Sequence, residues 1–379
     1  MINLFQPNLG DDELKAISQV FKSNWLGKGD FVNEFEERFA LNLNSSPSKF
    51  LSTTSCTEGI FLAAELFDFN SADQIIIPTI SFPSVASSVV AKGAQVVFCD
   101  VDKITLNVTA KNIKKVITES TKAVFITHYG GVPCDMDPII KLCNENNILI
   151  IEDSACAVKS FYKGKACGTI GDMGIWSFDA MKTLSTADGG MMYIKNDKLR
   201  IKAKELLYLG LPHKQKSGLD SSTLSNNSWW EFEMNYPGRR AIMNNLTASI
   251  GCVQLKKLNG FLSRRKEIHE MYFNSLKHLE WITLPPKMGK DYISSYYFFT
   301  IQTKHRTELA NYLLANDVYS TFRYWPLNKI KLFKQYVNDD FPDSEYASSH
   351  SLNIPLHQSL SNGDVKKIIA LIKNFKSSQ

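Results

Sequence analysis

A single lysine lies in a stretch whose residue types could support covalent chemistry. Lys182 belongs to the segment GIWSFDAMKTLSTADGGMMY, residues 174–193. A lysine amine can form a Schiff base with an aldehyde. Ser177 could hold an anionic group of the same molecule, and Gly189-Gly190 allow the backbone to approach closely. A lysine beside two glycines is also typical of a solvated surface turn, so this stretch alone leaves both interpretations open.

A second stretch has the composition of an anion site. In TSCTEG, residues 54–59, a short strand pattern changes to a helical pattern at about Thr57. The free N–H groups at a helix start, beside the hydroxyls of Ser55 and Thr57, can bind a phosphate. Alternatively, these hydroxyls only cap the helix.

The segment from residue 74 to residue 155 alternates between apolar runs and helical patterns. The apolar runs are QIIIPTIS, AQVVFCDVD, AVFITHYGG and ILIIEDSA. Such alternation predicts a mostly parallel sheet covered by helices, with ligands beyond the carboxyl ends of the strands. Phe82, His128 and Asp153 follow or close three of these runs. A carboxylate at such a position needs a partner, although Asp153 could instead cap a helix that begins after it.

Helical patterns on either side of this sheet indicate two domains. Residues 11–22 and 31–43 have apolar positions at helical spacing, and a long helical pattern covers residues 246–279, with an expected interruption at Gly260. We expect this long helix to link a large domain with an N-terminal arm, residues 1–252, to a smaller α/β domain, residues 253–379. The polar segment 213–230 predicts an excursion near the active site.

Composition excludes several classes of protein. The net charge of +5, from 43 basic and 38 acidic side chains among 379 residues, is too mild for a nucleic-acid-binding protein but suits a small anionic substrate. The sequence predicts no membrane span and no signal peptide, so we expect a cytoplasmic protein. Its seven cysteines form no CxxC pair, which predicts reduced thiols and no metal site.

Seven ordered motifs resemble those of the DegT-type sugar aminotransferases, which are pyridoxal 5'-phosphate (PLP) enzymes of fold type I. The motifs are SNWLGKGDFVNEFEERFA, TSCTEG, PTISF, HYGGVPCDMD, IIEDSACA, SFDAMKTLSTADGG and ASIGCVQLKKL. The resemblance implies an α/β fold of a large domain, with a mostly parallel sheet of the seven-stranded type, and a smaller C-terminal α/β domain.

The resemblance also implies roles for particular residues. Lys182 would bind PLP covalently and then move a proton between cofactor and substrate, Asp153 would pair with the pyridine nitrogen, and Phe82 would stack on the ring. Arg240 would reach the phosphate from the second subunit of a homodimer with composite active sites. The implied cofactor-binding residues are Cys56, Thr57, Glu58, Phe82, Asp153, Cys156, Ser177, Lys182 and Arg240.

Departures from the family pattern concern the substrate. Cys156 stands where Gln or His is usual near the phenolic oxygen of PLP, Asp179 replaces a frequent His or Tyr, and Asn328 replaces a frequent His. Arg239 could contact substrate or only pair with surface carboxylates. The implied substrate-binding residues are Trp25, Lys28, His128, Asp179, Arg239, Arg323, Tyr324 and Asn328.

Together, the resemblance implies PLP-dependent transamination of an anionic keto-sugar, nucleotide-linked, with L-glutamate as amino donor. The product would be an amino sugar for a surface polysaccharide such as the O-antigen of lipopolysaccharide. Lys182 stands where dehydrating relatives carry His, which favours amino transfer. One alternative is an aminotransferase that acts on a free keto-sugar acid, such as an oxidised octulosonate. Another is a PLP-binding regulator without turnover.

Overall fold

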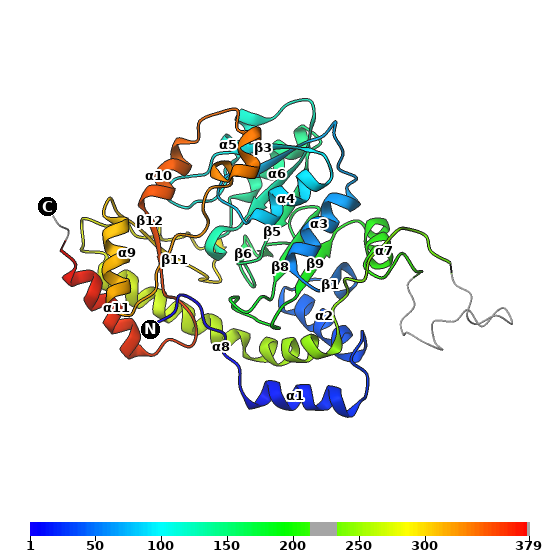
Figure 1. The fold of residues 1–379 in the computed structure, drawn as a ribbon, viewed down its shortest axis with the longest axis horizontal. Helices are drawn as coiled ribbons and strands as arrows, with labels where there is room; N and C mark the ends of the chain where they lie inside the picture. Colours follow the sequence, from blue (N-terminus) through cyan, green and yellow to red (C-terminus); the bar gives the residue numbers. More distant parts are fainter. Residues whose placement is uncertain (213–232, 377–379) are drawn as a thin grey trace.

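The computed structural model describes residues 1–212 and 233–376. Figure 1 shows a large α/β domain joined to a smaller domain by one long helix, α8. Up to the start of α8, the helices and strands are α1 (Asp11–Lys22), α2 (Asp30–Asn42), β1 (Phe50–Thr53), α3 (Cys56–Leu66), β2 (Gln74–Pro78), α4 (Pro83–Ala91), β3 (Gln95–Cys99), α5 (Ala110–Val116), β4 (Thr121–Thr127), α6 (Met136–Glu145), β5 (Leu149–Asp153), β6 (Phe161–Tyr162), β7 (Lys165–Ala166), β8 (Met173–Ser177), β9 (Gly190–Ile194) and α7 (Asp197–Leu206). They are followed by α8 (Asn245–Leu276), β10 (Tyr292–Ile293), β11 (Phe299–Gln302), α9 (Arg306–Ala315), α10 (Pro342–His350), β12 (Ser351–Ile354) and α11 (Asn362–Asn374).

The large domain is built on a seven-stranded sheet with strand order β1-β9-β8-β5-β4-β2-β3. The pairs from β8 to β3 are parallel, whereas β9 is antiparallel to both of its neighbours. The predicted α/β fold with a mostly parallel sheet is therefore confirmed. Because β1, β2, β4, β5 and β8 run in the same direction, their carboxyl ends meet at one edge of the sheet, where α/β folds bind their ligands.

The strands are apolar because both faces of the sheet are covered. One face packs against α3, α4 and α7 through a core that includes Ile75, Ile77 and Phe125. The other face packs against α5 and α6 through Ile76, Val124 and Ile150. Adjacent residues of one strand thus enter different cores, which explains the continuous apolar runs in place of apolar-polar alternation.

Helix α8 continues from the large domain into the small one. It packs against α1 and α2 near its start and against α11 further along, as Figure 1 shows. The expected interruption at Gly260 is wrong: the helix is continuous, and a Cβ at Gly260 would meet no heavy atom within 4 Å. A glycine inside a helix costs about 1 kcal/mol relative to alanine, and the buried residues along α8 outweigh that cost.

The small domain has its own core around an antiparallel pair of strands, β11 and β12. Ile268 and Tyr272 of α8, Leu313 of α9 and Ile368 of α11 are buried there. The predicted boundary between residues 252 and 253 falls inside α8. Within the described residues, no helix is both long enough and apolar enough to cross a membrane.

Candidate active site

A cavity of about 270 Å³ opens where the carboxyl ends of the parallel strands meet. It receives side chains from the ends of β5 and β8, from the loops after β1, β2 and β4, and from the segment 178–189 after β8. Two segments of the small domain close its other side. Its lining residues are Ser55, Cys56, Thr57, Ile60, Phe82, Ser84, Thr127, His128, Asp153, Ala155, Cys156, Ser177, Asp179, Met181, Lys182, Asp188, Tyr297, Arg323 and Tyr324.

Lys182 projects into this cavity from a closed loop. The N–H of Phe178 donates to the carbonyl of Gly189 at 2.9 Å, and the N–H of Lys182 donates to the carbonyl of Asp179 at 2.9 Å. The Lys182 Nζ lies 3.6 Å from the Sγ of Cys156. The amine is therefore held inside the protein and is not a solvated surface group.

The surroundings of Lys182 act on its pKa in opposite directions. Burial lowers the pKa by removing the ammonium from water, but the acidic groups of Cys156, Tyr297 and Tyr324 outweigh this effect and raise it. Burial in turn raises the pKa of the Cys156 thiol, and it raises that of Tyr297 to about 12.

Asp153 stands at the end of β5, with only 4% of its surface exposed. Its Oδ1 accepts a hydrogen bond from the N–H of Ala155 at 3.0 Å. Burial raises the pKa of Asp153, and the bond from Ala155 and the charge of Lys182 offset only part of that effect. A cationic partner in the cavity would relieve the cost of the ionised form.

The start of α3 also lines the cavity. Ser55 is the N-cap residue, and its Oγ accepts the N–H of Glu58 at 3.1 Å. Both interpretations of the TSCTEG turn are thus compatible, because capping uses one N–H group and leaves earlier ones free for an anion. Gly190 of β9 keeps this end open, since a Cβ there would lie 2.7 Å from the backbone nitrogen of Cys56.

Aromatic and cationic side chains form the rim. The ring of Phe82, 44% exposed, packs edge-on against Tyr324 with a centroid distance of 5.5 Å. The guanidinium of Arg323 lies over the ring of Phe5 at 5.2 Å. Tyr324 also places its hydroxyl 3.9 Å from the Sγ of Cys156. Phe82, Arg323 and Tyr324 are therefore brought together, as the sequence predicted for residues of one site.

His128 lines the cavity, but both of its ring nitrogens have protein partners. The N–H of Cys134 donates to Nδ1 at 3.1 Å, so the ring proton is on Nε2 and points to Glu152. Glu152 is fully buried and faces away from its neighbour Asp153. Four groups donate to the Glu152 carboxylate, namely Nε2 of His128 at 2.9 Å and the N–H groups of Gly168, Ile170 and Gly171 at 2.7, 2.7 and 2.6 Å.

Several residues predicted for the site lie outside this cavity. Arg239 pairs with Glu58 at 2.5 Å and with Glu65 at 2.6 Å, in agreement with the surface-pairing alternative. Arg240 lies over the ring of Tyr208 at 5.8 Å. The polar segment 213–230 lies outside the described residues.

The turn at residues 24–29 is also separate from the cavity. Trp25 donates from Nε1 to the carbonyl of Lys28 at 2.9 Å, and the Lys28 amine lies 3.6 Å from Glu36. Asn328 lies in a short 3-10 helix, Leu327–Lys329, and its buried Oδ1 accepts no hydrogen bond within the described part of the chain. None of Trp25, Lys28 and Asn328 is among the lining residues.

The structure adds site residues that the sequence motifs did not reveal. The ring of Tyr297, from the small domain, lies 5.0 Å from the Nζ of Lys182. Its neighbours in sequence form an aromatic strand pattern that gives no sign of a contact with a residue of the large domain. The IIEDSACA motif likewise indicates a role only for Asp153, and it gives no sign that the neighbouring Glu152 accepts a hydrogen bond from His128.

The donor set of the cavity fits PLP. A helix start and Ser177 offer neutral donors to a phosphate, Lys182 offers an amine to an aldehyde, and Asp153 offers a carboxylate to a ring nitrogen. The aromatic ring of Phe82 lies at the rim of the same cavity. Each functional group of the cofactor therefore has a chemically suitable partner among residues that line one space.

Comparison with known proteins agrees with this geometry. Over 370 residues, the chain is 41% identical to a dTDP-4-dehydro-2,3,6-trideoxy-D-glucose 4-aminotransferase of Saccharopolyspora spinosa, covering 97% of this chain and 95% of the relative. It is 30% identical to a GDP-perosamine synthase of Escherichia coli O157:H7, covering 100% and 99%. The crystal structure of the aminotransferase TlmJ from Streptoalloteichus hindustanus superposes with a TM-score of 0.92 at 42% identity, covering 98% of each chain.

The family model for the DegT/DnrJ/EryC1/StrS aminotransferases matches residues 7–373, nearly the whole chain. The relatives with assigned activities are sugar aminotransferases that act in amino-sugar synthesis. The chain therefore belongs to the DegT/DnrJ/EryC1/StrS aminotransferase family and is a PLP-dependent aminotransferase.

Proposed function

We propose that this enzyme transfers the amino group of L-glutamate to a nucleotide-linked 4-keto sugar. The observation that carries the proposal is the 41% identity, across 97% of the chain, to an aminotransferase that aminates C4 of a dTDP-linked keto-sugar. The similarity to a GDP-perosamine synthase also supports a nucleotide-linked sugar, with GDP in place of dTDP. The amino sugar would serve a surface polysaccharide such as an O-antigen, and the enzyme would work in the cytoplasm.

In this proposal Lys182 is the catalytic residue. PLP, when bound, supplies an electron sink for negative charge on the substrate carbon. The Nζ of Lys182 would hold PLP before the substrate arrives, and it would then remove a proton at the amino-bearing carbon of the donor and deliver one at the keto-sugar carbon that becomes aminated. Asp153 keeps the ring nitrogen protonated. Tyr297 and Cys156 lie beside the amine and would help to hold it in the cavity.

The residues at the cavity mouth would recognise an anionic sugar. Arg323 has a planar guanidinium suited to a phosphate or carboxylate, and it stands beside Tyr324 at the rim. Asp179 also lines the cavity, and its Oδ1 accepts the N–H of Met181 at 2.9 Å, so it can accept bonds from sugar hydroxyls with its other oxygen. This arrangement suits a neutral sugar ring with a charged group further out.

A competition assay tests whether the acceptor sugar is linked to a nucleotide. We expect dTDP or GDP to inhibit glutamate-dependent amination competitively with the keto-sugar, because the nucleotide part contributes binding energy on its own. Inhibition by a sugar carboxylate, together with no inhibition by any nucleoside diphosphate at millimolar concentration, would replace the proposal with a free keto-sugar acid. A protein that binds PLP but shows no amino transfer with either class would be the non-catalytic regulator.

We further propose a homodimer in which each active site contains residues of both subunits. The phosphate end of the cavity is lined by Ser55, Cys56, Thr57 and Ser177, which carry no positive charge. A phosphate dianion there would gain from a cation. Arg240 of a second subunit would supply that charge, since in its own chain it lies outside the cavity, over Tyr208.

Mixing inactive variants tests the shared site. We expect Lys182→Ala and Arg240→Glu chains to be inactive alone and to regain about a quarter of the wild-type rate after subunit exchange. In this estimate half of the dimers are mixed, and each mixed dimer has one intact site of two. A Lys182→Ala and Lys202→Glu mixture is the control, and its activity should equal that of the Lys202→Glu chains it contains. Subunit exchange with no recovery would argue against the shared site.

A further inference from the structure

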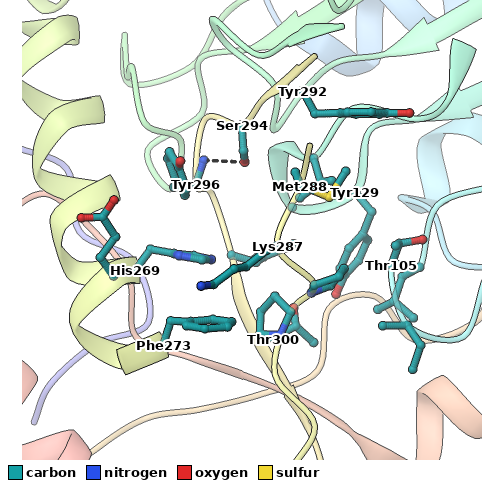
Figure 2. A pocket seen from close by; sticks show the side chains of 18 of the residues that line it. Thr105, Tyr129, His269, Phe273, Lys287, Met288, Tyr292, Ser294, Tyr296 and Thr300 are labelled. Carbon is teal, nitrogen blue, oxygen red and sulfur yellow. Dashed lines mark hydrogen bonds between the residues drawn. The ribbon is translucent and has the colours of Figure 1, made fainter. Parts of the chain in front are cut away.

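A second cavity, of about 420 Å³, lies between the large and small domains. The proposed catalytic residues do not line it. Figure 2 shows Thr105 and Tyr129 of the large domain on one side and His269 and Phe273 of α8 on the other. Its lining residues are Ile104, Thr105, Leu106, Tyr129, Gly130, Val132, His269, Glu270, Phe273, Asn274, Pro285, Pro286, Lys287, Met288, Tyr292, Ser294, Tyr296, Phe298 and Thr300.

This cavity shares a wall with the cofactor cavity. Tyr297 lines the cofactor cavity, whereas its neighbours Tyr296 and Phe298 line the second one. The same division separates His128, which faces the cofactor, from Tyr129, which faces the second cavity. In both segments, consecutive residues thus line different cavities. A single layer of backbone therefore separates the two spaces, and a ligand on one side can displace residues of the other.

A hydrogen-bond network connects the shared wall with the substrate end of the active site. The hydroxyl of Tyr129 donates to the backbone carbonyl of Arg323. Asn353 accepts the N–H of Arg323 at 2.8 Å and donates to the Tyr129 hydroxyl at 3.4 Å. The ring that forms a wall of the second cavity thus helps to fix the backbone of the arginine proposed to bind the anionic substrate.

The lining has the chemistry of a site for a planar anion. The ammonium of Lys287 lies at the exposed rim, 4.9 Å from the ring centroid of Phe273. Glu270 also lines the cavity, and its carboxylate lies 3.9 Å from the ammonium of Lys266. The aromatic side chains in the lining are Tyr129, Phe273, Tyr292, Tyr296 and Phe298.

His269 gives this apolar wall a polar group. Burial lowers the pKa of its imidazole to about 4, so the ring is neutral at pH 7. Figure 2 shows this ring pointing from α8 toward Lys287. A neutral imidazole can donate one hydrogen bond and accept another, which suits a ring substituent near the anionic group.

We propose that this cavity binds a small planar molecule with an aromatic ring and one anionic group, and that its occupancy regulates the neighbouring active site. The ring would stack between the aromatic side chains, and the anion would face Lys287 at the rim. A ligand that displaces the shared wall would change the position of Arg323 through Tyr129 and that of Lys182 through Tyr297.

The planar anion 8-anilinonaphthalene-1-sulfonate is a suitable probe for the holoenzyme. We expect its fluorescence to saturate at one probe per chain. Val132→Phe should weaken binding at least about tenfold by filling the cavity, and Lys287→Met should weaken it about fivefold. The matched controls are Val337→Phe and Lys290→Met, which alter exposed residues outside the lining. Equal affinity in each variant and its control would overturn the site.

A separate measurement tests whether occupancy of the second cavity changes the rate of amino transfer. Saturating probe should change kcat/KM for amino transfer by about fivefold or more in the wild-type holoenzyme, and the change should disappear in Val132→Phe but persist in Val337→Phe. Reciprocity applies to binding, so the factor by which saturating keto-sugar changes the affinity for the probe should match the factor by which saturating probe changes the affinity for the keto-sugar. An effect of the probe that persists in Val132→Phe, or probe binding with no change in rate, would overturn the regulatory proposal.

Discussion

Lys182→Ala should reduce the rate of amino transfer by about 10³-fold or more, because the variant loses both the covalent attachment point and the proton-transferring amine. The Nζ of Lys182 lies inside the cavity, 3.6 Å from Cys156, where bulk water cannot readily replace it as a base. Steady-state kinetics on the purified variant, reconstituted with PLP, measures the loss. Borohydride treatment of the wild-type protein should attach PLP to the peptide that contains Lys182, and it should attach none in the variant.

Chemical rescue distinguishes a lost amine from a damaged fold. In Lys182→Ala the removed side chain leaves space in which a small primary amine can bind, so ethylamine should restore part of the rate. In Lys182→Met the side chain fills that space, and ethylamine should have no effect. Turnover of Lys182→Ala at the wild-type rate, without added amine, would contradict the assignment of Lys182.

The sheet and its functional edge could be predicted because local patterns determine them. Apolar runs such as ILIIED predict buried strands, and the helices between them require parallel connections, which place the strand ends together. Asp153 and Ser177 therefore came to one cavity as the sequence indicated. Each of these inferences depends on short segments and on a general rule of α/β folds.

Contacts between distant segments could not be predicted in this way. The Tyr297 ring reaches Lys182 from another domain, and no local pattern encodes that approach. Arg239 and Glu58 belong to motifs that both suggested ligands, yet in this chain they bind each other. Charged side chains often satisfy one another when their elements pack together, and only the tertiary arrangement reveals which pairs form.

Helix α8 illustrates the limit of residue propensity. Gly260 predicted an interruption because glycine weakens helices, but tertiary packing maintains the helix on both sides of that residue. The consequence is functional, because a continuous α8 gives the small domain a rigid connection to the large one. Tyr297, Arg323 and Tyr324 of the small domain are thereby held against the cofactor cavity.

Asp153→Asn should reduce the rate of amino transfer by about 10²-fold to 10³-fold, the usual effect of removing one preorganised electrostatic partner from an active site. Asn has nearly the same shape as Asp, so the cavity and the hydrogen bond from Ala155 need not change. What is lost is the negative charge that keeps the pyridine nitrogen protonated. Stopped-flow and steady-state rates, with the PLP content of each sample measured, separate this loss from weaker cofactor binding.

Thermal unfolding adds a measurement that is independent of activity. Burial raises the pKa of Asp153, so the folded chain without PLP binds this proton more tightly than the unfolded chain does. The stability that this proton contributes is therefore present below the unfolded pKa of Asp and is lost as the pH rises through the folded pKa. Asp153→Asn should then unfold at an equal or higher temperature than the wild type in the absence of PLP, and it should gain less from added PLP.

Asp188→Asn is the matched control, because Asp188 lines the same cavity and also has its pKa raised by burial. If activity depended only on the total negative charge in the cavity, Asp153→Asn and Asp188→Asn would lose equal activity. If Asp153 acts specifically on the ring nitrogen, Asp188→Asn should lose far less activity and should respond to PLP as the wild type does. Near-normal turnover of Asp153→Asn would leave Asp153 with only its structural bond to Ala155.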